Sequence, residues 1–143
     1  MKKLPDKILP QAGVIPFRIK SGKLKILIIT SSSGNKWLFP KGLVEKNMTK
    51  VESAALEAKE ESGVLGEVLL QKIGSYMIFK YNTHYKVDMF PMEVDRLLAR
   101  WPEEKIRKRK WVSPENVDEY IKDNQLLKLV DEFNRLKLDK NNQ

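Results

Sequence analysis

The 143-residue chain contains no cysteine and only one histidine, His84. The absence of cysteine excludes disulfides and thiolate metal sites, but does not by itself fix the cellular compartment. His84 is predicted to lie at a turn, where a surface position is more common than a catalytic one. Any chemistry is therefore expected to come from carboxylates and basic side chains.

The chain also lacks a long hydrophobic run. No stretch approaches the roughly 18–20 apolar residues that span a membrane. The amino terminus carries two lysines, but Pro5, Asp6, Lys7 and Pro10 interrupt the segment that follows, which argues against a signal peptide. We therefore expect a cytoplasmic protein without a membrane partner.

Acidic residues are outnumbered. Lys and Arg total 27 against 19 Asp and Glu, a net charge of +8. This excess favours anionic partners such as phosphorylated small molecules, nucleic acid or an acidic surface, although lysine that only aids solubility explains it equally well. A hydrophobic content of 41% argues against disorder, and the length suits one domain over residues 1–143.

The order of predicted elements is strands, a helix, strands and helices, which favours a mixed sheet covered on both faces. Hydrophobic patterns predict strands over 12–18, 24–30, 66–73, 76–81, 85–94 and 107–112. Helices are predicted over 50–62, 114–121 and 126–136, followed by a frayed tail at 139–143. Pro16 and Pro91 are predicted to mark edge strands or bulges, since proline donates no ladder hydrogen bond.

The helix over 50–62 has the best-marked ends and the most unusual face. Thr49 and Glu52 have the spacing of a capping box, and Gly63 suits the left-handed residue after a helix. Glu57, Glu60 and Glu61 share one face, where like charges repel. Taken alone, such a run is more often a solvated helix face, and the alternative is a bound divalent cation that offsets the repulsion.

These residues resemble the Nudix box, G-x5-E-x7-R-E-U-x-E-E-x-G-U, where U is an apolar residue. The positions that match are Gly42, Glu57, Ala58, Glu60, Glu61, Gly63 and Val64. The preceding residues 37–41 resemble the segment that leads into the box, and Arg107–Trp111 looks like the basic segment of the diphosphoinositol polyphosphate branch. The resemblance implies an α/β fold, a Nudix-type α/β/α sandwich with a mixed β-sheet, and pyrophosphatase activity with Mg²⁺ or Mn²⁺.

Two positions depart from the box. Met48 stands at its first Glu and Leu56 at its Arg. In the family, that Arg helps to orient neighbouring carboxylates and the first Glu supports the loop or the metal site, so neither role carries over. Glu45 and Glu52 are nearby acids that could substitute. The alternative is therefore a weak or inactive Nudix domain that binds a nucleotide or RNA.

The candidate site residues fall into three groups. The predicted metal ligands are Glu57, Glu60 and Glu61, which together with Glu104 are also the predicted catalytic residues. Glu103 and Glu104 lie where family members often place another acid, although surface solvation accounts for them as well. Predicted substrate-binding residues are Lys41, Gly42, Arg107 and Arg109, since guanidinium groups suit phosphate oxygens. Gly63 and Glu45 are predicted to have structural roles in the motif.

The predicted function is metal-dependent hydrolysis of a diphosphate linkage in a nucleotide-type or other polyphosphorylated small molecule. The basic run favours highly charged substrates such as dinucleoside polyphosphates or diphosphoinositol polyphosphates. ADP-ribose-like compounds and nucleoside triphosphates stay open, and nucleic acid is a less favoured partner. Both a monomer and a homodimer are compatible with the sequence.

Overall fold

The computed structural model describes residues 7–141, and within that range eight strands form one mixed sheet. The strands are β1 (Ile8–Lys20), β2 (Lys23–Thr30), β3 (Trp37–Leu38), β4 (Lys41–Leu43), β5 (Val64–Val68), β6 (Gly74–Lys80), β7 (Thr83–Leu97) and β8 (Arg109–Val112). The helices are α1 (Lys50–Ser62), the 3-10 helix η1 (Pro114–Glu119) and α2 (Asn124–Asn141).

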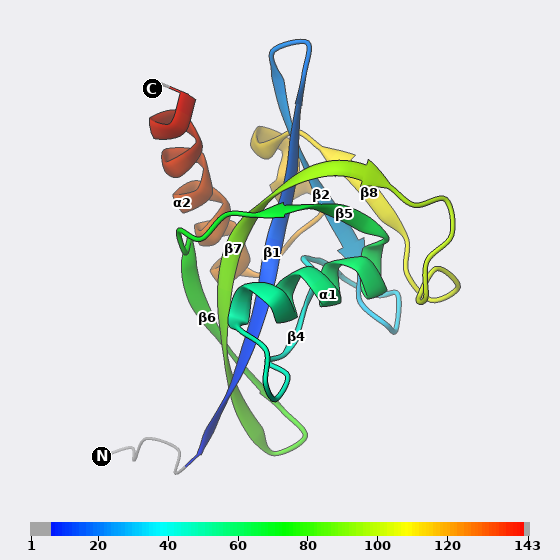
Figure 1. Ribbon diagram of the computed structural model, residues 1–143, viewed down its shortest axis with the longest axis vertical. Helices are drawn as coiled ribbons and strands as arrows, with labels where there is room; N and C mark the ends of the chain where they lie inside the picture. Colours follow the sequence, from blue (N-terminus) through cyan, green and yellow to red (C-terminus); the bar gives the residue numbers. More distant parts are fainter. Residues whose placement is uncertain (1–6, 142–143) are drawn as a thin grey trace.

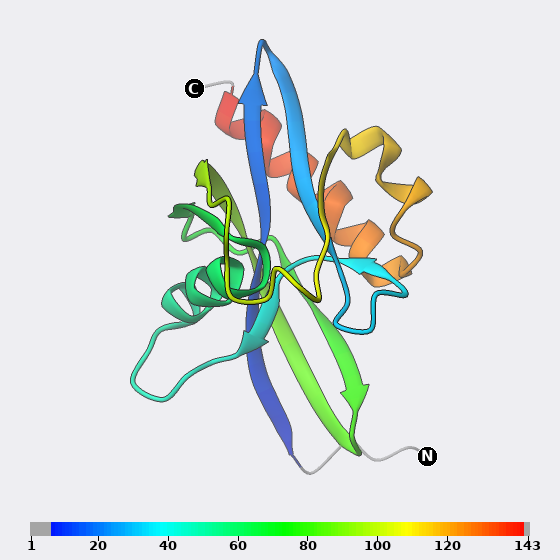
Figure 2. The ribbon, with the colours of Figure 1, turned by 90° about the vertical axis from the view of Figure 1, so that its right-hand side faces the viewer.

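The two longest strands, β1 and β7, form the centre of the sheet. They run parallel, with Ile8 opposite His84 and Phe17 opposite Glu93 at the two ends of the paired segment. The β1–β2 and β6–β7 hairpins extend in opposite directions from this centre (Figure 1). In Figure 2, α1 lies on one side of β1 and the first half of α2, in orange, lies on the other. The predicted mixed sheet with helices on both faces is confirmed.

Both prolines lie inside central strands, so the prediction that they mark edges or bulges is wrong. β1 pairs with β4 as far as Gly13 and with β2 from Phe17 onward, which leaves Pro16 between two partners. β7 passes from β6 to β5 in the same way around Pro91. β1 and β7 pair with each other through both prolines, but neither proline lies opposite a residue of a second partner strand. A missing N–H costs least at such a change of partner.

Most of the predicted elements form with shifted ends. β1 and β7 are longer than predicted, β5 covers Val64–Val68 instead of 66–73, and the last strand begins at Arg109. The helix predicted over 114–121 is the shorter 3-10 helix η1, and Ser113 makes no capping hydrogen bond because its hydroxyl accepts one from Lys25. α2 continues into the tail that was predicted to fray, as far as Asn141. Residues 1–6 and 142–143 lie outside the described range, so predictions about them stay untested.

Candidate active site

Helix α1 has the limits that its sequence predicts. The hydroxyl of Thr49 accepts the backbone N–H of Glu52 at 3.1 Å, and the carboxylate of Glu52 accepts the backbone N–H of Thr49 at 2.8 Å. Gly63 ends the helix with φ of 67°, a left-handed conformation that glycine adopts without strain. The capping box and the predicted role of Gly63 are thus both seen in the structure.

Gly42 leaves room for the carboxyl group of Glu57. It lies in the extended strand β4, opposite Ala12. A Cβ atom added to Gly42 would stand 2.3 Å from Cδ of Glu57, much closer than atoms in contact allow. A glycine at this position therefore lets α1 place a carboxylate directly on β4.

Glu61 is 7% exposed and lies beside Glu57. Its Oε1 accepts the backbone N–H of Lys41 at 3.1 Å, and its Oε2 lies 3.4 Å from a guanidinium nitrogen of Arg107. Burial raises the pKa of Glu61 to about 8, although the charges of Arg107 and Lys41 partly oppose this. Burial and the charge of Glu60 raise the pKa of Glu57, whose side chain also shares a hydrogen bond with Glu61.

The site also has a positive side. Burial lowers the pKa of the Lys41 ammonium group, the nearby charge of Glu61 opposes this, and the charge of Arg107 adds to it. Glu45 adds a further negative charge that raises the pKa of Glu57, and its backbone N–H donates to Ser53 Oγ at 2.9 Å. The predicted residues Lys41, Gly42, Glu45, Glu57, Glu60, Glu61 and Arg107 thus gather at one place, between β4 and the second half of α1.

Of the two neighbouring acids in the loop before β8, Glu103 faces this place. The Nε of Arg107 donates to Glu103 Oε1 at 2.9 Å, and the charge of Glu103 raises the pKa of Glu57. Glu104, the predicted catalytic acid, is instead bound by Arg100, whose Nε lies 2.7 Å from Glu104 Oε1. The sequence holds no signal that favours Glu103, because the spacing of Glu103 to Arg107 equals that of Glu104 to Arg100.

Arg109, predicted to bind substrate, has other contacts. Its guanidinium donates to the carbonyl oxygens of Ser62 at 2.9 Å and of Leu98 at 2.7 Å, and it stacks 4.0 Å above the ring of Trp101. Arg107, by contrast, is 11% exposed and also donates to the carbonyl of Thr30 at 2.9 Å. The structure brings Arg107 to the carboxylates and places Arg109 at the carboxyl end of α1.

The donor set suits a hard divalent cation. Glu57 and Glu61 supply adjacent carboxylate oxygens, and Mg²⁺ commonly takes one or two carboxylates plus waters and substrate phosphates. Among residues 7–141, no group of three or more His, Asp or Glu side chains is arranged to hold a metal ion. A two-carboxylate site fits the residues present, and the backbone carbonyl of Glu60 is occupied by the N–H of Glu103 at 3.1 Å.

Sequence comparisons agree with this geometry. The family model described as "NUDIX domain" matches residues 8–133. "Nudix hydrolase 16, mitochondrial" of Arabidopsis thaliana is 41% identical over 127 residues, which cover 76% of this chain and 69% of that protein. "Nudix hydrolase 17, mitochondrial" of the same plant is 35% identical over 120 residues, 78% of this chain and 65% of that protein. The chain thus spans about two thirds of these relatives' length.

Solved structures show the same fold. A binary complex of the C. elegans Ap4A hydrolase superposes with a TM-score of 0.78 at 17% identity, covering 92% of this chain and 99% of that one. The NUDIX domain of Shewanella oneidensis NrtR, complexed with ADP ribose, gives a TM-score of 0.72 at 13% identity, covering 93% and 90%. Over residues 7–141, none of the helices has the length and apolar character needed to cross a membrane.

Proposed function

The chain belongs to the Nudix family and is a hydrolase of pyrophosphate bonds, and from this premise we propose that it uses Mg²⁺ or Mn²⁺ to cleave a polyphosphorylated small molecule. One observation carries the proposal. The carboxylate of Glu57 lies against Gly42 and shares a hydrogen bond with Glu61, and the cations of Lys41 and Arg107 lie beside Glu61. Carboxylates for a metal and cations for phosphate oxygens are the two requirements of diphosphate cleavage.

Each residue has a part in this scheme. Glu57 and Glu61 would hold the cation, which would supply Lewis acidity and lower the pKa of a bound water. Lys41 and Arg107 bind phosphate oxygens and offset the negative charge that develops on the leaving group. Since one ionised guanidinium contacts both Glu61 and Glu103, Arg107 also keeps these two acids in place.

The proton of the attacking water needs a carboxylate acceptor. Glu60 and Glu103 are the candidates for this general base, since the proposal assigns Glu57 and Glu61 to metal binding. Glu103 is favoured over the predicted Glu104, because it is bound to Arg107 while Glu104 is bound to the exposed Arg100. Replacing each acid by glutamine gives a matched pair of variants, in which Glu103→Gln lowers kcat and Glu104→Gln leaves it unchanged.

The proposed substrates are highly charged diphosphates. Dinucleoside polyphosphates are supported by the fold shared with the Ap4A hydrolase, and ADP-ribose by that shared with the NrtR domain. Diphosphoinositol polyphosphates are supported by the basic residues 107–110 and the net charge of +8. These three classes form the panel for an activity screen with Mg²⁺ and Mn²⁺.

The screen tests the proposal when it is run on the wild-type chain and on Glu57→Gln and Glu61→Gln. The metal-dependent hydrolytic activity of each variant should fall by more than the roughly 10–100-fold that is typical when a residue which only supports a metal ligand is replaced. Thermal unfolding of the same samples shows whether the variants are folded. Unchanged metal-dependent turnover in both folded variants contradicts the assignment of these carboxylates.

A protein that binds without cleaving is the alternative, favoured by Met48 and Leu56 at two box positions. Calorimetry separates the two, since ligand binding without turnover in Mn²⁺ identifies the binder. A cytoplasmic location, one domain over 1–143 and the choice between monomer and homodimer stay predictions. Cell fractionation bears on the first of them, because several relatives carry "mitochondrial" in their names.

A further inference from the structure

The carboxyl end of α1 is held by one segment, residues 98–109, which we call the cap segment. The last carbonyls of a helix have no partner within it and must find donors elsewhere. Gly63 supplies one, since its N–H donates to the carbonyl of Lys59 at 3.0 Å. Figure 1 shows the cap segment, in yellow-green, beyond the end of α1 that leads into β5.

The cap segment satisfies the next four carbonyls in succession. The backbone N–H of Glu103 donates to the carbonyl of Glu60 at 3.1 Å, and Nε1 of Trp101 donates to that of Glu61 at 3.0 Å. Nη1 of Arg109 donates to the carbonyl of Ser62 at 2.9 Å, and the backbone N–H of Leu98 donates to that of Gly63 at 2.8 Å. Two of these donors are backbone groups and two are side chains. The side chains also contact each other, because Arg109 stacks 4.0 Å above the Trp101 ring.

The carbonyls held in this way belong to the turn that carries the candidate carboxylates Glu60 and Glu61. We propose that Trp101 and Arg109 are positioning residues, which hold this turn so that Glu61 meets the cation with Glu57. The inference rests on the proposed metal-dependent function. Misplacing a functional group by about 1 Å is enough to impair its function. A hydrogen bond that holds the backbone of this turn therefore also affects where its carboxylate side chains lie.

Position 56 gives this support added weight. Leu56 precedes Glu57 on the helix, and its side chain carries no group that can bind a carboxylate. Position 56 therefore makes no contact that orients the carboxylates, and their orientation depends on other groups. Arg107 supplies part of it through Glu61 Oε2 at 3.4 Å, and the cap segment supplies the backbone part from the same stretch of chain.

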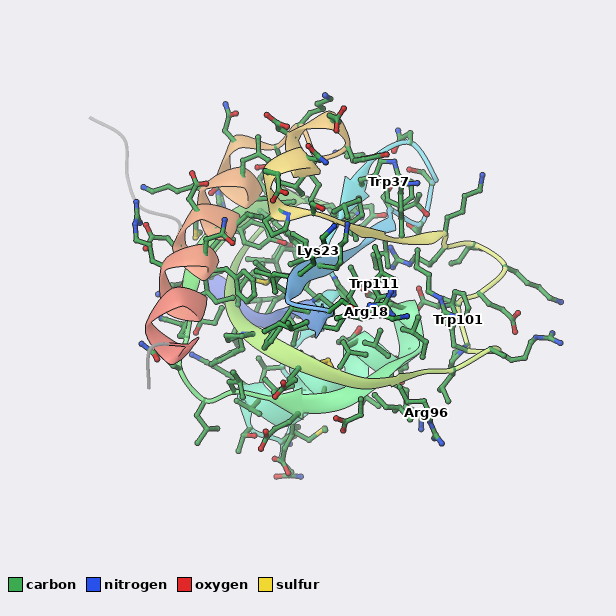
Figure 3. All side chains as sticks on the ribbon, turned by 90° about the horizontal axis from the view of Figure 1, so that it is seen from above. Arg18, Lys23, Trp37, Arg96, Trp101 and Trp111 are labelled. Carbon is green, nitrogen blue, oxygen red and sulfur yellow. The ribbon has the colours of Figure 1, made fainter. Side chains whose placement is uncertain are left out.

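The chain contains a matched control for Trp101. Trp111 also lies under a guanidinium, with Arg18 at 4.1 Å from the ring, but its buried Nε1 has no hydrogen-bond partner among the described residues. Figure 3 shows Trp101 beside the outer loop and Trp111 beside Arg18, nearer the middle of the molecule. Changing either tryptophan to phenylalanine keeps an aromatic ring, and only Trp101→Phe removes a hydrogen bond to α1.

The experiment measures Mn²⁺ binding by calorimetry, far below the melting temperature, in the wild-type chain, Trp101→Phe and Trp111→Phe. Trp101→Phe should weaken Mn²⁺ binding about tenfold, the lower end of the range for groups that support a metal ligand, and Trp111→Phe should leave it within about twofold. Amide hydrogen exchange of metal-free protein adds a second readout. The N–H groups of Gly63 and Glu103 should exchange faster in Trp101→Phe alone.

Arg109→Lys is the second variant, because it keeps the charge but removes the fork that reaches two carbonyls. It should also weaken Mn²⁺ binding several-fold, and it decides the matter where Trp101→Phe does not fold. Wild-type affinity for Mn²⁺ in a folded variant of either kind overturns the positioning role while leaving the proposed function intact. Absence of Mn²⁺ binding in the wild-type chain overturns both.

Discussion

The two faces of the sheet differ in what holds them. The face covered by α2 is a large apolar core, in which the rings of Phe17 and Phe133 approach to 5.3 Å between centroids. The face covered by α1 buries small side chains such as Ala54 and Ala58 together with the carboxylate of Glu61. The first face buries the larger apolar cluster, and the second buries small side chains beside the carboxylates of the proposed site.

This division has a physical basis. Burying a carboxylate costs free energy, and two adjacent carboxylates cost more because like charges repel. The α1 face therefore bears a free-energy cost at Glu57 and Glu61 that the apolar face does not. Variants on either face should consequently change one measurement and leave the other unchanged.

The largest expected effect comes from the apolar face. Phe133 is 1% exposed, so Phe133→Ala should lower the free energy of unfolding by about 3–5 kcal/mol. Mn²⁺ affinity, measured where the variant is still folded, should not change. Phe79→Ala is the control, because Phe79 is 61% exposed and its loss should cost little. A fall in Mn²⁺ affinity in folded Phe133→Ala would break the comparison.

The pH dependence of metal binding should be the next largest effect. Because burial raises the pKa of Glu61 to about 8, a cation must displace a proton at lower pH. Mn²⁺ affinity should then fall about tenfold per pH unit below 8 and level off above it. Calorimetry in buffers of different ionisation enthalpy detects the released proton, and a flat affinity between pH 6 and 8 contradicts the expectation.

The same pKa has the opposite consequence for the metal-free protein. The folded state keeps the Glu61 proton up to about pH 8, whereas the unfolded chain loses it near the ordinary value of 4.5. The folded state thus binds more protons between these values, and the free energy of unfolding should decrease as pH rises across this window. Denaturant titrations of wild-type and Glu61→Gln in chelator test this, since the variant should lack that part of the slope.

Gly42→Ala should give a smaller effect confined to the α1 face. A new Cβ would stand 2.3 Å from the carboxyl carbon of Glu57. Because all the close atoms belong to the flexible side chain of Glu57, that side chain can move aside while the backbone stays in place. We expect about tenfold weaker Mn²⁺ binding with little loss of stability. Gly22→Ala, where a Cβ meets nothing within 4 Å but φ is +74°, is the contrasting control that should cost stability alone. Equal metal affinity in Gly42→Ala and wild type would contradict the role given to this glycine.

The smallest effect concerns the start of α2. The carboxylate of Asp123 accepts the backbone N–H groups of Gln125 at 2.8 Å and Leu126 at 3.3 Å, as a helix cap does. Asp123→Ala should cost about 1 kcal/mol of unfolding free energy and leave Mn²⁺ binding unchanged. The exposed Asp118 provides the control variant Asp118→Ala. Equal stability of the two variants would show that the cap is unimportant.

Local signals were the ones that sequence reasoning read correctly. Thr49, Glu52 and Gly63 fixed both ends of α1, because capping acts between residues that are close in the chain. The shared face of Glu57 and Glu61 followed from the helical period. No local signal in residues 107–110 indicated which guanidinium would reach the carboxylates, or that Arg109 would contact Ser62 and Trp101.

By itself, then, the sequence determined the order of the main strands and helices, both ends of the helix that carries the carboxylates, and the family resemblance, since each depends on spacing along the chain. Only the tertiary structure decided that Glu103 rather than Glu104 faces the site, and that Arg109 holds the end of α1 while Arg107 reaches Glu61. Neighbouring residues of equal chemistry in an irregular segment follow no period. For Arg109, the partner Ser62 on α1 lies 47 residues away in the chain, and folding alone brings the two together.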